Sequence, residues 1–135
     1  MNVKLLNNNA TLPTRGTSNS AGLDLYCTND QVLEPGLNII PLGISVEIPD
    51  NFYGRIADRS SMASRSLHIF AGVVDSDYRG EVKVIMFNFN QFPITIDKGS
   101  RVAQLIIEPY SNVTPIQVLT VTDTTRTGGF GSTGV

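Results

Sequence analysis

Short runs of β-branched and aliphatic residues, separated by turn signals, are the feature that most constrains this fold. Val, Ile and Thr number 12 each among the 135 residues, and such residues favour strands over helices. The runs predict strands at 23–27, 42–48, 82–87, 94–96, 102–107 and 116–121. Gly and Pro recur between them, which predicts turns. The pattern favours an all-β chain, a jelly-roll-like β-barrel or sandwich.

Two segments depart from the strand pattern. Only 60–66 fits a helix, and of one or two turns at most. The stretch 123–135 is rich in Thr and Gly and almost free of aliphatic residues, a composition typical of a mobile terminus. We therefore predict one β domain over 1–122 and a flexible Gly-rich C-terminal tail over 123–135.

Composition excludes several classes of function. The net charge of −2 and a pI near 5.2 argue against a nucleic-acid or anionic-membrane partner. Charged residues make up 16% of the chain, compared with about 25% in typical domains. This low charged fraction suggests that part of the surface is covered by other subunits of an oligomer. Cys27 is the only cysteine, so no internal disulfide forms and a buried, inert thiol is expected. The one histidine, His68, and the lack of a G-x-S-x-G motif argue against a Ser-His-Asp hydrolase.

Targeting signals are also missing from the pattern. No apolar run approaches the roughly 20 residues of a membrane helix, and the start M-N-V-K-L-L-N-N-N is not a signal peptide. We expect a soluble intracellular protein, in a compartment that the sequence does not indicate.

Two polar clusters suggest a phosphate site. Asp24 interrupts a short apolar run in A-G-L-D-L-Y, where a carboxylate needs a cationic partner unless it points outward at a sheet edge. The segment G-R-I-A-D-R-S-S-M-A (54–63) brings Arg59, Ser60 and Ser61 to the start of the possible helical turn. Hydroxyl groups, free N–H groups and guanidinium bind phosphate there. The alternative is an ordinary helix cap with solvent-exposed arginines.

Two further clusters suggest a nucleotide site. A-G-V-V-D-S-D-Y-R-G (71–80) predicts a strand, a tight turn and a returning strand, with Asp75 at the end of the apolar run. A partly desolvated carboxylate there is suited to accept a proton, although a hairpin with solvated acids is common. In R-T-G-G-F-G-S-T-G (126–134), glycines permit close backbone approach, Arg126 can pair with phosphate and Phe130 can stack on a ring. The alternative is a plain flexible terminus.

Together with G-S-R-V-A-Q-L-I-I-E (99–108), these segments resemble, in order, the five motifs of the trimeric dUTPases. Those enzymes hydrolyse dUTP to dUMP and pyrophosphate. The resemblance spans about residue 4 to residue 134 and implies a homotrimer of β-rich subunits with active sites at the interfaces. It also implies a role in keeping uracil out of DNA and supplying dUMP for dTTP synthesis.

The resemblance implies a role for each matching residue. Asp75 corresponds to the general base that activates the water attacking the α-phosphate, and Asp24 to the carboxylate near Mg²⁺, acting through metal-bound water. Tyr78 corresponds to the ring under the deoxyribose, beside a uracil slot formed by the backbone of 73–78. The implied substrate contacts are Arg59, Ser60, Ser61, Val73, Val74, Tyr78, Gln104, Arg126, Phe130, Gly131, Ser132 and Thr133. The last five, with their neighbours, form a tail that closes over the site of another subunit.

The chain also departs from the family pattern. Asp58 stands where Pro is usual, Ser61 replaces Gly, Arg65 replaces Lys, and 65–71 is slightly short. We expect Asp58 to add negative charge on the phosphate side and to weaken binding.

Two rival functions have their own signatures. A dCTP deaminase resembles this pattern but carries a catalytic Glu where Ile85 stands here. A non-enzymatic, dUTPase-like binding module is expected to have lost Asp75, Tyr78 or the tail, and all three are present.

Overall fold

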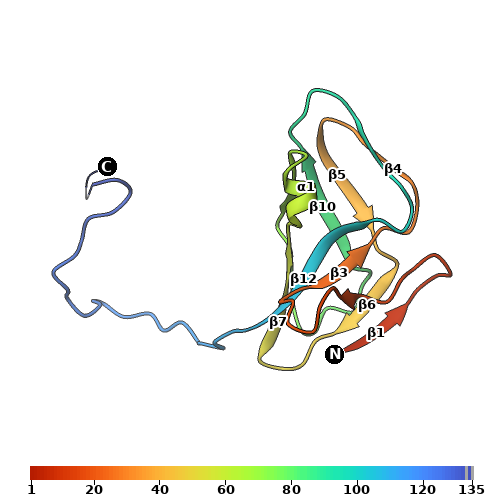
Figure 1. The fold of residues 1–135 in the computed structure, drawn as a ribbon. Coiled ribbons are helices and arrows are strands. Elements are labelled where there is room, and N and C mark those ends of the chain that lie inside the picture. Colours follow the sequence, from red (N-terminus) through yellow and green to blue (C-terminus); the bar gives the residue numbers. More distant parts are fainter. Residues whose placement is uncertain (133, 135) are drawn as a thin grey trace.

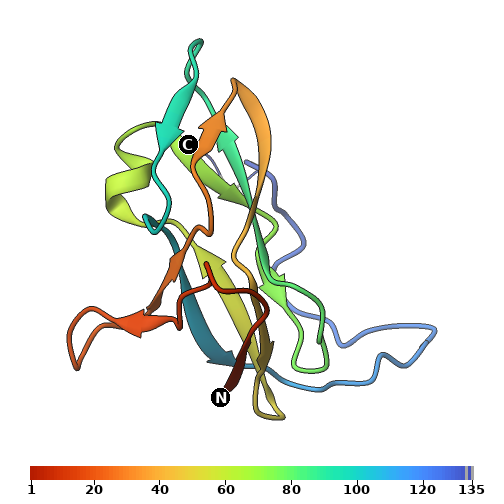
Figure 2. The same ribbon diagram turned by 90° about the vertical axis from the view of Figure 1, so that its right-hand side faces the viewer.

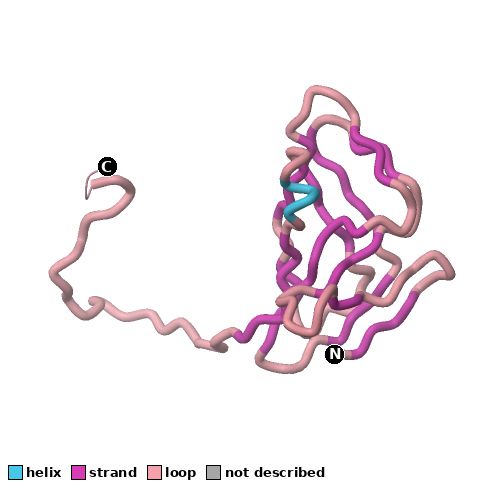
Figure 3. The backbone as a smooth tube through the Cα atoms, viewed as in Figure 1, coloured by secondary structure: helices cyan, strands magenta, loops and turns pink. Residues whose placement is uncertain are grey.

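The computed structural model describes residues 1–132 and 134. Within them the chain is almost wholly strands and loops, with one short helix (Figures 1 and 3). In chain order the elements are β1 (Asn2–Leu5), β2 (Thr14–Arg15), β3 (Leu23–Tyr26), β4 (Gln31–Leu33), β5 (Gly36–Pro41), β6 (Ile44–Glu47), β7 (Phe52–Ala57), α1 (Ser60–Ala63), β8 (Leu67–Phe70), β9 (Val73–Val74), β10 (Lys83–Asn88), β11 (Ile94–Ile96) and β12 (Arg101–Pro109). The predicted all-β class is confirmed, as is a single helical turn inside 60–66.

The strands form two main sheets and two small pairs. A five-stranded sheet has the order β2-β3-β12-β7-β9, and a three-stranded sheet the order β5-β10-β8. The pairs are β1-β6 and β11-β4, and every pairing is antiparallel. The arrangement is jelly-roll-like (Figure 2), and in the described part of the chain it does not close into a barrel.

One core lies between the sheets because alternate residues of each strand point inward. Leu25 and Leu105 from the large sheet meet Val84 and Met86 from the small one, all at most 1% exposed. Cys27 belongs to this core, and burial raises the pKa of its thiol. The expected burial of Cys27 is confirmed.

The strand predicted at 116–121 is wrong. β12 ends at Pro109, and the chain then leaves the body as an extended arm (Figure 1). Ile116 is 80% exposed and Leu119 fully exposed. A strand needs a neighbour to satisfy its N–H and C=O groups, and no described strand pairs with this segment.

The predicted strand–turn–strand at 71–80 is correct in its elements but not as a hairpin. The turn exists, since Tyr78 N–H donates to the Asp75 carbonyl at 3.1 Å. β9, however, pairs with β7 and β10 with β5 and β8, so the turn crosses between the two sheets. The crossing opens a space where the sheets diverge.

No helix in the described range has the length and apolarity needed to cross a membrane.

Candidate active site

A polar pocket lies at the N-terminal end of α1, against β3 and β12. Its volume is about 260 Å³, and it is lined by Gly16, Ser20, Gly22, Asp24, Arg59, Ser60, Arg101 and Gln104. The structure thus brings together Asp24, Arg59, Ser60 and Gln104, four of the residues predicted from the sequence. Ser61 lies beside them, with its Oγ accepting a hydrogen bond from Arg59 at 3.2 Å.

Asp24 is the electrostatic centre of the polar pocket. Its side chain is 14% exposed, and its carboxylate lies 3.0 Å from Arg59 Nε and 3.7 Å from Arg101 Nη1. Because β2 and β12 flank β3, Asp24 is not at a sheet edge. Of the two alternatives for this residue, a carboxylate with a cationic partner is therefore correct. Two guanidinium groups against one carboxylate leave a net positive site, which suits a polyphosphate. Sequence reasoning missed Arg101, although its place in the fourth motif was a signal.

Gln104 is positioned by the space that Gly22 leaves. Its Nε2 donates to the Asp58 carbonyl at 2.7 Å. A Cβ on residue 22 would lie 2.9 Å from the Cβ of Gln104 and closer still to its amide oxygen. The glycine of A-G-L-D-L-Y is therefore required by close packing rather than by backbone conformation.

Gly22→Ala is expected to displace the Gln104 amide and weaken phosphate binding. Real Cβ atoms do not approach so closely, so the Gln104 amide must swing aside and the backbone must also shift to separate the two Cβ atoms. For dUTP, the substrate that the family resemblance implies, we expect KM to rise about tenfold, since a misplacement of about 1 Å can cost up to about 10²-fold. Steady-state kinetics measure this change in KM. Gly99→Ala is the comparison variant for stability, because a Cβ there meets no atom within 4 Å but strains the backbone at φ +79°. An unchanged KM would contradict the packing role.

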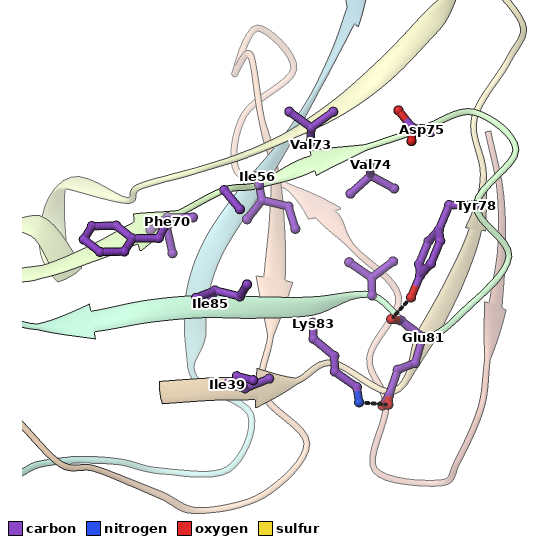
Figure 4. Close-up of a pocket in the computed structure, with 14 residues that line it drawn as sticks. Ile39, Ile56, Phe70, Val73, Val74, Asp75, Tyr78, Glu81, Lys83 and Ile85 are labelled. Atoms are coloured by element: carbon purple, nitrogen blue, oxygen red, sulfur yellow. Dashed lines mark hydrogen bonds and ion pairs between the residues drawn. The ribbon is translucent and has the colours of Figure 1, made fainter. Parts of the chain in front are cut away.

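An apolar pocket of about 340 Å³ lies where the sheets diverge (Figure 4). It is lined by Ile39, Ile56, Ile69, Phe70, Ala71, Gly72, Val73, Val74, Asp75, Tyr78, Glu81, Val82, Lys83 and Ile85. The pocket thus brings together four predicted residues: the nucleoside contacts Val73, Val74 and Tyr78, and the general base Asp75.

Local backbone constraints shape the apolar pocket. Gly72 has φ +94°, and a Cβ there would lie 2.6 Å from the Ile56 carbonyl oxygen, so glycine alone fits this bend into β9. The Tyr78 hydroxyl donates to the Glu81 carbonyl at 2.9 Å, which holds the ring over the opening (Figure 4). A Cβ on Gly80 would strike that ring.

Asp75 lies at the rim of the apolar pocket and is exposed (Figure 4). The partial desolvation expected for its carboxylate is not provided by this chain alone. β9 has two residues and ends at Val74, so the carboxylate lies beyond the sheet. It also faces a second hollow, lined by Tyr53, Val73, Asp75, Ser76, Asp77 and Tyr110.

A hydrogen-bonded triad stands beside that hollow. Glu108 accepts from Arg55 Nε and Nη2 at 3.1 and 3.0 Å and from the Tyr53 hydroxyl at 2.5 Å. The Arg55 bonds, and then the Tyr53 bond, lower the pKa of Glu108. The same hydrogen bond from its phenol raises the pKa of Tyr53.

Glu108→Gln is expected to reduce stability at neutral pH but not in acid. A carboxyl whose folded pKa is lowered contributes stability above its unfolded pKa, which is about 4.3, and loses it as pH falls through the folded value. The effect is small because the triad is partly exposed. Thermal unfolding of both proteins at pH 7 and pH 3 measures it. A difference in Tm that persists at pH 3 would contradict the ionic origin.

The polar and apolar pockets share no lining residue, and none of the tail residues that the structure describes lines either pocket. Phe130 is fully exposed, and the hydrogen bonds of Arg126 reach only Thr124 and Gly128. Among the described residues, no hydrogen bond joins the tail, including Gly131 and Ser132, to either pocket; Thr133 lies outside the described residues. One chain therefore holds three separate groups of predicted site residues.

Asp58 does not face the polar pocket, so the basis for the expected charge repulsion is wrong. Its carboxylate turns toward β8, where it accepts the Ile69 N–H at 2.6 Å and lies 3.2 Å from His68 Nδ1. It is not among the residues that line the polar pocket.

The site residues allow one kind of metal binding. In the described part of the chain, no three His, Cys, Asp or Glu side chains gather as a metal cluster. Asp24 offers a single carboxylate in the polar pocket, beside Arg59 and Arg101. Mg²⁺ fits such a site, because it keeps several waters and takes the rest of its ligands from substrate phosphates.

Known proteins match this chain over nearly its whole length. The dUTPase family model matches residues 8–134. A probable deoxyuridine 5′-triphosphate nucleotidohydrolase of Schizosaccharomyces pombe is 42% identical over 136 residues, covering 98% of this chain and 97% of that protein. A variant dUTPase of Staphylococcus bacteriophage 80alpha, solved with dUpNHpp, has a TM-score of 0.90 and 28% identity, covering 99% and 98% of the two chains. A variant dUTPase of S. aureus phage phi11, in which a structural Mg(II) ion is coordinated, has a TM-score of 0.82 and 26% identity over 88% and 96%.

Proposed function

The chain belongs to the dUTPase family, and on this premise we propose that it hydrolyses dUTP to dUMP and pyrophosphate. The observation that carries the proposal is the pair of pockets, one cationic and one apolar, each lined by residues of the family motifs. A deoxynucleoside triphosphate needs both environments. The biological role that follows is to limit uracil in DNA and to supply dUMP for dTTP synthesis.

The apolar pocket takes the uracil and the deoxyribose. The backbone of 73–78 pairs with the edge of the base, and β9 leaves little room for a 5-methyl group. The Tyr78 ring, held by its bond to the Glu81 carbonyl, lies under the sugar and excludes a 2′-hydroxyl. This discriminates dUTP from both dTTP and UTP.

The polar pocket takes the phosphate chain. Arg59 and Ser60 bind phosphate oxygens, Gln104 adds an amide donor, and Arg101 supplies further positive charge. Asp24 would hold Mg²⁺ through water, and the ion would neutralise part of the triphosphate charge. Screening matters because the negative phosphates otherwise repel an incoming nucleophile.

Asp75 is the general base. Its carboxylate takes a proton from a water molecule as the water oxygen bonds to the α-phosphorus. The bond from that phosphorus to the α–β bridging oxygen breaks, and pyrophosphate leaves with the bonding electrons. The tail closes over the site, with Arg126 on the terminal phosphate, Phe130 over the uracil, and Gly131, Ser132 and Thr133 along the phosphate chain.

We propose a homotrimer in which different subunits complete each site. The separation of the two pockets and the tail within one chain supports this. So does the arm after Pro109, whose apolar residues lie unpaired although their pattern predicts a strand, as expected if another subunit provides the neighbour.

The outward side of the β5-β10-β8 sheet also supports self-association. Ile39, Phe70 and Phe89 are 58%, 43% and 56% exposed, and the ring of Phe87 stacks at 5.2 Å from that of Phe70. An uncovered apolar surface of this kind marks an interface. Because Ile39 and Phe70 also line the apolar pocket, a second copy seated there forms part of the nucleoside site.

The test is pyrophosphate release from dUTP, dCTP, dTTP and UTP, each with Mg²⁺ and with EDTA. Rapid Mg²⁺-dependent release from dUTP alone is expected. Ammonia released from dCTP would favour the deaminase. Ile85 on β10 argues against that activity, because its side chain cannot transfer protons as the Glu of a deaminase does. Binding of dUTP without turnover by a folded trimer would favour the binding module.

A further inference from the structure

Asp58 joins three parts of the molecule at one point. It stands in the two-residue connection between β7 and α1, directly before Arg59. Its Oδ1 accepts the Ile69 N–H at 2.6 Å and its Oδ2 lies 3.2 Å from His68 Nδ1, both on β8. Its carbonyl accepts the Gln104 amide of β12 at 2.7 Å. The side chain thus ties the connection to the small sheet while the backbone ties it to the large one.

The bond to Ile69 is one that the sheet cannot supply. β8 is an edge strand, paired with β10 on one side, and an edge leaves backbone N–H groups without a ladder partner. A carboxylate is a strong acceptor for such a group, since hydrogen bonds to a charged partner are about twice as strong as neutral ones. The His68 ring is in turn packed edge-on to Phe89, with 5.4 Å between centroids. The acceptor therefore meets a fixed strand, not a mobile loop.

The tie acts on the phosphate side of the proposed site. Arg59 and Ser60 follow Asp58 in the chain, and Gln104 is bonded to its carbonyl, so three groups of the polar pocket depend on where this residue lies. We infer that Asp58 is a positioning residue for the β- and γ-phosphates, an inference that rests on the proposed function. A Pro at this place restrains the connection through its ring; Asp58 restrains it through hydrogen bonds to β8.

The experiment compares the affinity of two ligands by calorimetry. dUpNHpp, with an N–H in place of the α–β bridging oxygen, reaches the polar pocket with its β- and γ-phosphates, whereas dUMP lacks them. For Asp58→Ala we expect affinity for dUpNHpp to fall about tenfold and that for dUMP to change less than twofold, as a lost charge-assisted bond implies. Asp58→Asn keeps an acceptor for the Ile69 N–H and is expected to restore binding to within about threefold. Asp50→Ala, an exposed aspartate in the β6–β7 turn, is the matched control.

The outcomes separate positioning from plain stability. Equal losses for both ligands, or no rescue by Asp58→Asn, would overturn the inference, because general destabilisation does not distinguish the ligands. If Asp58→Ala does not fold, His68→Ala is tested in the same way, with a selective loss of about threefold expected and no loss overturning the inference.

A second measurement does not depend on the reaction. Hydrogen exchange of the peptide spanning 58–66 is expected to speed up in Asp58→Ala and not in Asp50→Ala. Unchanged exchange would overturn the positioning role even if dUTP is hydrolysed. Failure of the unaltered protein to hydrolyse dUTP would overturn the proposed function, while faster exchange would still show that Asp58 orders this connection.

Discussion

Asp75→Asn is expected to lower the turnover of dUTP by at least about 10²-fold, the low end of what a general base contributes. The amide has nearly the same shape and hydrogen-bonding reach as the carboxylate but cannot accept the proton of the attacking water. Because Asp75 lies at the rim of the apolar pocket, the base and sugar contacts stay in place. The affinity for dUpNHpp is therefore expected to change little. Single-turnover kinetics with excess enzyme isolate the chemical step.

The control for this variant lies in the same turn. Asp77→Asn removes the same charge two residues away and leaves the backbone of 73–78 in place. Because the Asp77 side chain lines neither the apolar nor the polar pocket, turnover is expected to stay within about threefold. A near-normal rate for Asp75→Asn would remove Asp75 as the base. Equal losses in both variants would show that the charge of the turn, rather than proton transfer, matters.

Deletion of 123–135 is expected to lower kcat/KM for dUTP by about 10²-fold while the trimer persists. The deleted residues include Arg126 and Phe130, which in the proposed mechanism order the phosphate chain and exclude water when the tail closes. In the structure this segment makes only local hydrogen bonds, so its removal costs the body no contact among those described. Kinetics and light scattering on the same sample measure both effects.

Mixed trimers test whether subunits share their sites. Asp75→Asn subunits still supply a tail, and tail-deleted subunits still supply Asp75. Refolding the two together is expected to recover activity that neither has alone. No recovery in proven mixed trimers would contradict a site shared in this way, and full activity of the tail-deleted protein would contradict the role of the tail.

Several features could be predicted from local sequence because local physics decides them. The strands predicted at 23–27, 82–87 and 94–96 match β3, β10 and β11 within a residue or two, since alternating apolar residues suit only a pleated, half-buried strand. The helical turn near Met62 also matches. β5, β7 and β8 were not predicted, because residues such as Arg55 and His68 interrupt their apolar pattern and only pairing across the sheet stabilises them there.

Two of the wrong predictions share one cause. Strand 116–121 has the right composition but no partner within one chain, and Asp75 has the right neighbours in sequence but no cover. We propose that another subunit supplies the missing surface in both cases, and no local pattern contains that surface. The turn at 75–78 was likewise expected within a hairpin, although its two strands belong to different sheets.

By itself, the sequence determined the all-β class, the buried cysteine and the identity of the groups that we propose to bind phosphate and uracil, because strand periodicity and motif chemistry are contained in neighbouring residues. Only the tertiary structure decided which of these groups meet. It paired Asp24 with two arginines, one of them unforeseen, and turned Asp58 away from the phosphate side to brace β8. These contacts join residues 10 to 77 positions apart, and such distant pairings are set by sheet register and packing, to which each residue contributes little alone.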